Sequence, residues 1–149
     1  MADSVRETII KAFMARGATI TGTGYNHALG SHVLRATKDV DPSCLPALVI
    51  WPQPETVERR EFGKYRISMP IKLEAIASFG TTNPSIIAEQ MLADMRKAFI
   101  SATAISSLID EVYYTGGGTD DYPDAGNMII GANALFTVIY LSSIQNPYT

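Results

Sequence analysis

The clearest pattern along the chain is an alternation of apolar and polar residues between positions 65 and 79. It predicts a long β-strand with one face in a core and the other facing water or a partner. Pro70 has no backbone N–H to donate, which predicts a bulge or an unpaired side within this strand. The apolar parity consists of Tyr65, Ile67, Met69, Ile71, Leu73, Ala75, Ala77 and Phe79.

A second long strand is predicted over Asn127–Leu141, where β-branched and aromatic residues recur with period two. One parity, from Ala134 to Tyr140, is wholly apolar, and the other is mixed. Two apolar-leaning faces favour a central strand that is covered on both sides. Because the stretch is far longer than an ordinary strand of about five or six residues, Gly131 predicts a bulge or bend inside it.

Two amphipathic helices are predicted. Ser4–Arg16 opens with the capping-box pattern, a serine followed three residues later by a glutamate, and Gly17 after it suits a left-handed C-terminal cap. Asn83 and Pro84 are favoured at the N-cap and first position of the second helix. Its apolar stripe is Ile87, Met91, Leu92, Met95, Ala98 and Phe99, and its solvent side is Glu89, Gln90, Asp94, Arg96 and Lys97.

The remaining segments complete the expected fold. A charged arm, Glu55–Glu61, should pair with the first long strand in a hairpin whose tip lies at Gly63. The order of elements predicts a single α+β domain over residues 1–149, with a mainly antiparallel twisted sheet of long strands and helices packed on one face. Shorter strands are predicted at His32–Thr37, Leu45–Trp51 and Val112–Thr115, and a further helical turn at Ile105–Ile109.

Composition narrows the function classes. The net charge of −3 gives no support to binding of nucleic acid by phosphate neutralisation. The single cysteine, Cys44, excludes an intramolecular disulfide. The sequence has no signal-peptide pattern at its start, and its longest apolar run falls short of the roughly 20 residues of a membrane helix. We therefore expect a soluble protein made in the cytoplasm, with no membrane partner.

The glycine run Gly116–Gly118 does not predict a phosphate-binding loop, because Thr119-Asp120-Asp121 follows in place of the required lysine. Flexible backbone joining two strands is the preferred interpretation. Asp120, Asp121 and Asp124 lack the spacing of a calcium loop, so a solvated acidic loop that serves as a contact surface is favoured over a cation site.

Histidine and serine patterns give no enzyme signature. His27 and His32 lack the further ligands that a zinc site needs, and they are interpreted as surface or loop residues. No Gly-x-Ser-x-Gly elbow presents a nucleophile. We predict no catalytic residue, no metal site and no cofactor, and hence a protein that is not an enzyme.

The charged arm has three interpretations, ranked from a solvated arm through a subunit interface to paired carboxylates for acid–base catalysis. The candidate interface residues are Glu58, Arg59, Arg60, Glu61, Lys64, Asp120 and Asp121.

A set of segments in fixed order covers nearly the whole chain: a capped N-terminal helix, the Leu45–Ile50 run, the charged arm entering a strand that ends in Leu-Glu-Ala, the Tyr114–Gly118 run, and Leu135–Tyr140 followed by Asn-Pro-Tyr. This arrangement resembles the tail terminator proteins of long-tailed bacteriophages, the minor tail protein U-like or neck proteins.

The resemblance implies a structural virion protein of the tail and neck, assembled in the host cytoplasm as a homo-oligomeric, hexameric ring. Such a ring caps the head-proximal end of the tail tube, ends tube growth and meets head-completion or connector proteins. Its implied partners are other copies of itself, the tail tube protein and the connector protein, with a sheath protein added if the tail is contractile. DNA would pass through the lumen without specific binding, and no catalytic residue is implied.

Two alternatives stay open. One is a head–tail joining protein of the same virion, and the other is a small α+β enzyme or ligand-binding protein with the Asp120–Asp124 loop and the two histidines near a pocket. The second apolar-leaning face of the C-terminal strand has no helix to cover it, and we expect a neighbouring subunit to supply that cover.

Overall fold

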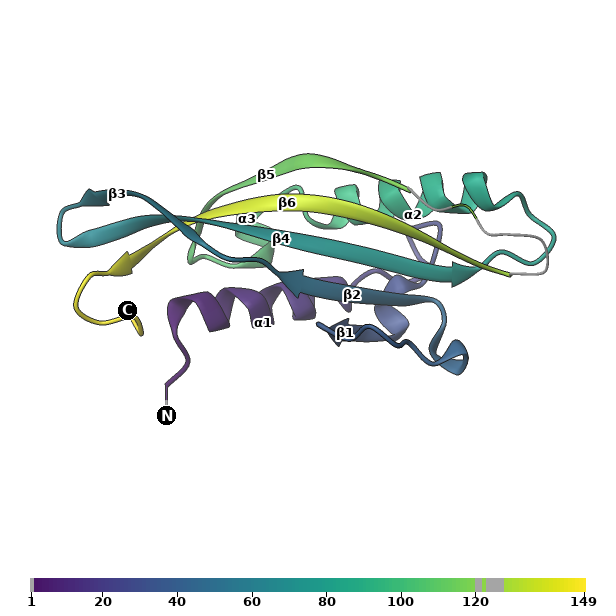
Figure 1. Cartoon of the computed structure of the whole chain (residues 1–149), viewed down its shortest axis with the longest axis horizontal. Coiled ribbons are helices and arrows are strands. Elements are labelled where there is room, and N and C mark those ends of the chain that lie inside the picture. Colours follow the sequence, from purple (N-terminus) through teal and green to yellow (C-terminus); the bar gives the residue numbers. More distant parts are fainter. Residues whose placement is uncertain (1, 120–121, 123–127) are drawn as a thin grey trace.

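The computed structural model describes residues 2–119, 122 and 128–149. Its sheet has six strands in the order β1-β2-β4-β6-β5, with β3 pairing the free part of β4 (Figure 1). The β1–β2 pair is parallel, and the other described pairs are antiparallel. The strands are β1 (Val33–Arg35), β2 (Ala47–Pro52), β3 (Thr56–Glu61), β4 (Lys64–Ser78), β5 (Ile109–Gly118) and β6 (Ile129–Ser143), and the helices are α1 (Val5–Gly17), α2 (Pro84–Ala98) and α3 (Ala102–Ile105), with 3₁₀ turns at Leu29–Ser31 and Pro42–Cys44.

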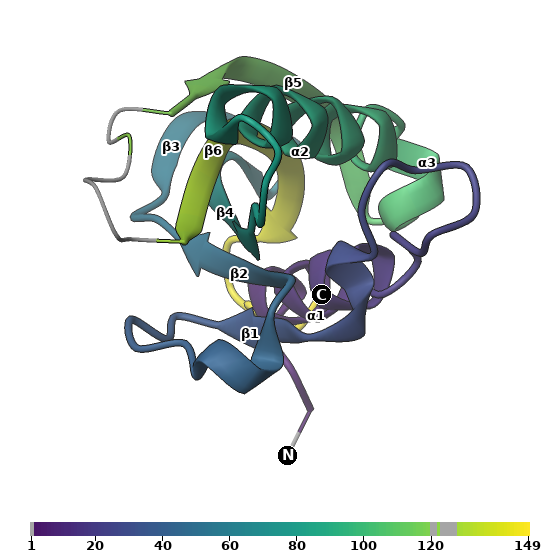
Figure 2. The ribbon, with the colours of Figure 1, turned by 90° about the vertical axis from the view of Figure 1, so that its right-hand side faces the viewer.

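The three helices pack against one face of the sheet, as predicted. Viewed along the long axis, the sheet curves past α1 and α2, which lie on the same side of it (Figure 2). The apolar parity of β4 points into a single hydrophobic core together with Phe136 and its neighbours on β6. Aromatic rings cross this core from helix to sheet: Phe13 stacks on Phe99 with 5.1 Å between ring centroids, and Phe99 meets Phe136 at 5.9 Å. The predicted α+β class, with a mainly antiparallel sheet, is confirmed.

β4 and β6 form one uninterrupted ladder from Lys64 opposite Ser143 to Ser78 opposite Ile129. β6 lies between β4 and β5, which confirms the predicted central position. Of the bulge or bend predicted at Gly131, the bulge is wrong, since this residue pairs in register with Ile76. The register shifts lie in β3 and β5 instead, because a strand with a partner on one side only can bulge without breaking a second ladder.

Pro70 lies where β4 changes its neighbour from β2 to β3. Pairing with β2 ends at Ile71, and pairing with β3 begins at Ser68. The backbone N–H of Gln53 donates to the carbonyl of Pro70 at 3.0 Å. In an antiparallel strand the backbone N and C=O of one residue point to the same side. The position where Pro70 lacks an N–H therefore faces the gap between the end of β2 and the start of β3. The predicted interruption at Pro70 is confirmed on this side, while its pairing with β6 is regular.

The helix ends differ in part from prediction. Ser4 Oγ accepts a hydrogen bond from the Glu7 N–H at 3.0 Å, but the Glu7 carboxylate binds Arg35, so only half of the capping box forms. Gly17 lies inside α1 and is not a left-handed cap. A Cβ on Gly17 would lie 2.8 Å from Leu48 Cδ2, so the glycine allows α1 to approach β2 closely.

The segment between α2 and β6 also needs correction. The helical turn lies at Ala102–Ile105, before the predicted Ile105–Ile109, and Ser101 Oγ caps it through the Ala104 N–H at 3.3 Å. Gly116–Gly118 belongs to β5 and is not a loop between strands. At Gly117 a Cβ would lie 2.5 Å from the Asn133 carbonyl oxygen, so glycine permits this close approach of β5 to β6.

Candidate interface on the arm and the outer sheet face

We use "arm" for residues 56–68, which are β3, its turn and the first residues of β4, and "outer face" for the sheet face opposite the helices. Glu61 pairs with Lys64, so Phe62 and Gly63 form a two-residue turn with φ of 50° and 77°. Positive φ at both positions matches the right-handed twist of the strands. β6 runs beside β4 to the end of the arm, and the Ile144 N–H donates to the Gly63 carbonyl at 3.1 Å. The arm is therefore three strands wide and held to its tip.

Five of the seven predicted interface residues come together on the arm: Glu58, Arg59, Arg60, Glu61 and Lys64. Asp120 and Asp121, and the Asp124 of the predicted acidic loop, lie outside the described residues. Of the arm residues, Arg59 and Glu61 form an exposed ion pair at 3.3 Å.

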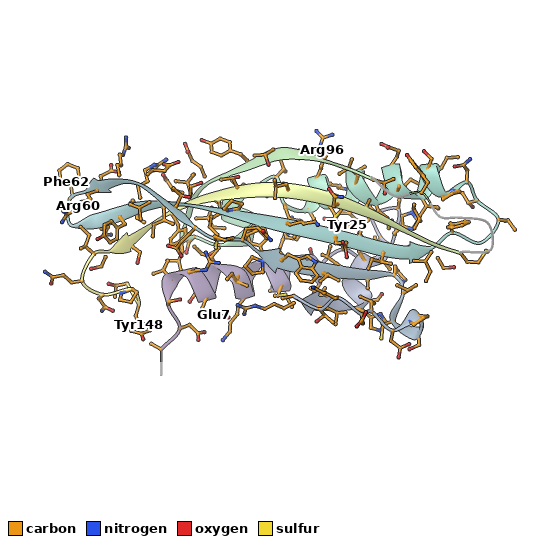
Figure 3. The ribbon with its side chains drawn as sticks, in the orientation of Figure 1. Glu7, Tyr25, Arg60, Phe62, Arg96 and Tyr148 are labelled. Atoms are coloured by element: carbon orange, nitrogen blue, oxygen red, sulfur yellow. The ribbon has the colours of Figure 1, made fainter. Side chains whose placement is uncertain are left out.

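Two cations near the tip, Arg60 and Lys64, have no carboxylate of the described residues within ion-pairing distance. Arg60 lies at the end of the arm, away from the body of the molecule (Figure 3). The tip thus presents positive charge that the chain itself leaves available to a partner.

At the base of the arm, Arg66 organises a charged cluster across the outer face. Its guanidinium lies 3.3 Å from Glu58 of β3, 2.6 Å from Asp110 and 3.1 Å from Glu111 of β5. The hydrogen bond to Asp110 is the main cause of the raised pKa of Arg66. Three carboxylates surround one guanidinium, so this part of the outer face is acidic.

The Arg66 cluster also covers part of β6. Because β6 lies between β4 and β5, the Arg66 side chain crosses its outer face, where Ile139 is only 3% exposed. The Tyr113 hydroxyl donates a hydrogen bond to Glu111, which raises the pKa of Tyr113. Further along β6, Leu135 is 38% exposed. The chain therefore covers one end of the second face of β6 with its own charged side chains and leaves the stretch around Leu135 open.

Sequence reasoning missed the Arg66 cluster, although Arg66 belongs to the polar parity of β4. Its β5 partners lie 44 and 45 positions later in the chain. They precede the predicted strand Val112–Thr115, and only the three-dimensional order of strands brings them to Arg66.

A pocket of about 340 Å³ lies between the base of the arm and the start of α1. In it the Arg6 guanidinium lies 3.2 Å from Glu55 and donates to the Gln53 carbonyl at 2.9 Å. The Tyr140 hydroxyl donates to Glu55 at 3.4 Å, and burial, with the nearby glutamate, raises the pKa of Tyr140 to about 12. The phenol stays neutral, and the ion pair joins α1 to the segment that enters β3.

The histidines take separate places. His27 lies in a loop, as predicted, and its Nε2 lies 2.9 Å from the Gln90 side-chain oxygen, so the side chain is partly buried against α2. His32 Nδ1 is buried without a hydrogen-bond partner among the described residues. Among all the residues that the structure describes, no three His, Cys, Asp or Glu side chains lie close enough together to hold a metal ion.

Asp94 contradicts its predicted place on the solvent side of α2, since it is 2% exposed. Its carboxylate accepts hydrogen bonds from the Asn26 N–H at 2.9 Å and the His27 N–H at 2.8 Å. The residue lies on the helix flank that the loop of residues 21–27 covers, and the loop's backbone donors satisfy the buried charge.

A scan of the chain against models of known protein families finds no match, and a comparison with curated proteins finds none either. In the described part of the chain, no helix is long and apolar enough to cross a membrane.

Proposed function

We propose that this chain is a structural subunit of a bacteriophage tail terminator ring, a virion protein that caps the head-proximal end of the tail tube. The observation that supports this proposal best is the arm, a three-stranded projection with available cations at its tip. Because exposed charges contribute little to the stability of the subunit itself, we interpret the arm as a surface for contact with another molecule.

The arm and the open part of the outer face are different surfaces of one subunit. A contact between them is heterologous, and repeated heterologous contacts form a ring where the rotation between neighbours closes and an open filament where it does not. Such a contact is compatible with a cyclic assembly, which we propose to be a hexamer, in the tail and neck of the virion. The remaining ring surfaces would contact the tail tube protein on one side and a head-completion protein on the other.

The charge of the chain is compatible with this role. With a net charge of −3, a ring of such subunits repels DNA on average, so that DNA passes through the lumen without specific binding. The proposal needs no catalytic residue and no cofactor.

The proposal is tested by measuring particle size and tube growth. Multi-angle light scattering and negative-stain imaging at micromolar concentration should show rings, alone or on tube ends. Purified tail tube protein should form shorter tubes when the chain is added. Monomers at both low and high salt, together with unchanged tube lengths, would contradict the proposal.

A further inference from the structure

Phe62 is fully exposed, at 100%, at the tip of the arm (Figure 3). Its φ of 50° lies in the left-handed region, which is unfavourable for a bulky residue and which asparagine, aspartate or glycine adopt at lower cost. The phenyl side chain of Phe62 therefore raises the local energy of the turn. It also exposes apolar surface and does not pack against the rest of the subunit. Phe62 combines backbone strain with exposed apolar surface and makes no packing contact within the subunit that would offset them. A contact with another molecule explains this combination best.

The surroundings of Phe62 point to the chemistry of that contact. Arg60 and Lys64 flank it and have no acidic partner among the described residues. An aromatic anchor with cations beside it suits an apolar patch that is bordered by carboxylates.

The outer face carries such a patch. Tyr113 of β5 pairs with Thr137, two positions along β6 from Leu135, so both exposed side chains lie on one face within contact distance of a shared ligand. Asp110 and Glu111 border the Tyr113 end of the patch, and one guanidinium, that of Arg66, is shared between them and Glu58. At the other end Lys72 of β4 lies opposite Leu135, so the carboxylates are concentrated on the side toward β5.

Phe62 cannot reach the patch of its own subunit. Leu135 lies opposite Lys72, eight residues along the continuous strand β4 from Lys64. At about 3.4 Å per residue, this rigid strand holds the tip roughly 27 Å away. The patch that fits the tip must therefore belong to a second copy.

We propose that Phe62 of one copy docks on the outer face of the next copy, between Tyr113 and Leu135, with Arg60 and Lys64 facing Asp110 and Glu111. This contact rests on the proposed ring, because it names the surfaces that join neighbouring subunits. It is heterologous, as the ring requires.

The first test is Phe62→Asn. Asparagine accepts the left-handed conformation, so the melting temperature of the dilute subunit should stay unchanged or rise, whereas self-association in sedimentation velocity should weaken at least tenfold. Ile100→Asn is the matched control, since it removes another exposed apolar side chain, 63% exposed, just after α2. It should leave association unchanged. Association of Phe62→Asn equal to that of the unsubstituted chain would overturn the docking proposal.

The second test is cross-linking between copies in a Cys44→Ser background. Cysteines are placed beside the contact residues so that Phe62, Tyr113 and Leu135 stay intact: protein with Glu61→Cys is mixed with protein with Thr137→Cys, the residue paired with Tyr113, and oxidised, and a covalent dimer should form. Glu61→Cys mixed with Ile100→Cys should give none. Rings without the expected dimer would overturn the docking site and leave the ring standing. If the cysteine variants give no covalent dimer and the unsubstituted chain also stays monomeric under all conditions, both proposals are overturned.

Discussion

Asp94 joins α2 to the loop of residues 21–27 through a buried carboxylate. Asp94→Ala leaves the N–H groups of Asn26 and His27 without their acceptor, so we expect the free energy of unfolding to fall by about 2–3 kcal/mol. Urea denaturation measures this change. Glu89→Ala, at an exposed position of the same helix, should change it by less than about 0.5 kcal/mol. Equal effects of the two substitutions would show that the Asp94 contacts contribute little.

Tyr140 gives a pH dependence with a definite sign. Its pKa is raised from 10 to about 12, so the folded state holds the phenolic proton more tightly than the unfolded state. The resulting stabilisation is complete below pH 10 and is lost as the pH rises from 10 to 12. Stability measured from pH 9 to pH 11.5 should fall more steeply for the unsubstituted chain than for Tyr140→Phe. Parallel curves would contradict the assignment.

The environment of single residues is the property that the sequence predicts least well. The helical period places Asp94 beside Arg96 and Lys97, which suggests a solvent-facing position. Its partners come from a loop 67 and 68 positions earlier, and no local pattern reports that the loop folds over this flank. The exposed Phe62 stands in the sequence beside Gly63, but its conformational strain is visible only from the turn.

At the scale of elements, β6 presents two faces with different roles. Phe136 is fully buried and packs against Phe99 and against Tyr114 at 5.5 Å between ring centroids. Phe136→Ala should lower the free energy of unfolding by about 3–5 kcal/mol. Leu135→Ala, one position away on the outer face, should cost the isolated subunit much less. Chemical denaturation of both variants at concentrations where the subunit is monomeric checks the difference, and similar losses would mean that the outer face is packed as tightly as the core.

The long strands and both main helices are predictable because their period-two and helical patterns are strong and local. Register irregularities are not. Gly131 suggests a bulge in the sequence, yet the register shifts occur in β3 and β5, because the strand order decides which strands have a free edge. The glycine run looks like a loop on composition, whereas close approach to β6 makes it strand.

At the scale of the whole molecule, the arm is separate from the core. Arg59→Glu combined with Arg60→Glu should weaken assembly, because it reverses the charge of the tip, and should change subunit stability by less than about 1 kcal/mol. Sedimentation for assembly and thermal melting for stability give the two readouts. A large loss of stability with assembly intact would make the arm a structural element of the subunit.

The candidate interface was predictable in part. Alternating charges around a hairpin tip pick out the arm residues from the sequence. The acidic and apolar surface that would receive them combines β5 and β6 with Arg66 of β4, and only the folded sheet assembles it.

The ladder between β4 and β6 affects when the docking surface forms during synthesis and folding of the chain. Each of its pairs joins residues about 50 to 80 positions apart, so we expect this ladder to form slowly relative to the local contacts of the helices. During synthesis β4 emerges from the ribosome well before β6. The outer face around Leu135 does not exist until β6 is inserted, so a growing chain has no complete docking surface to offer. The order of synthesis would thereby delay assembly until each subunit is folded.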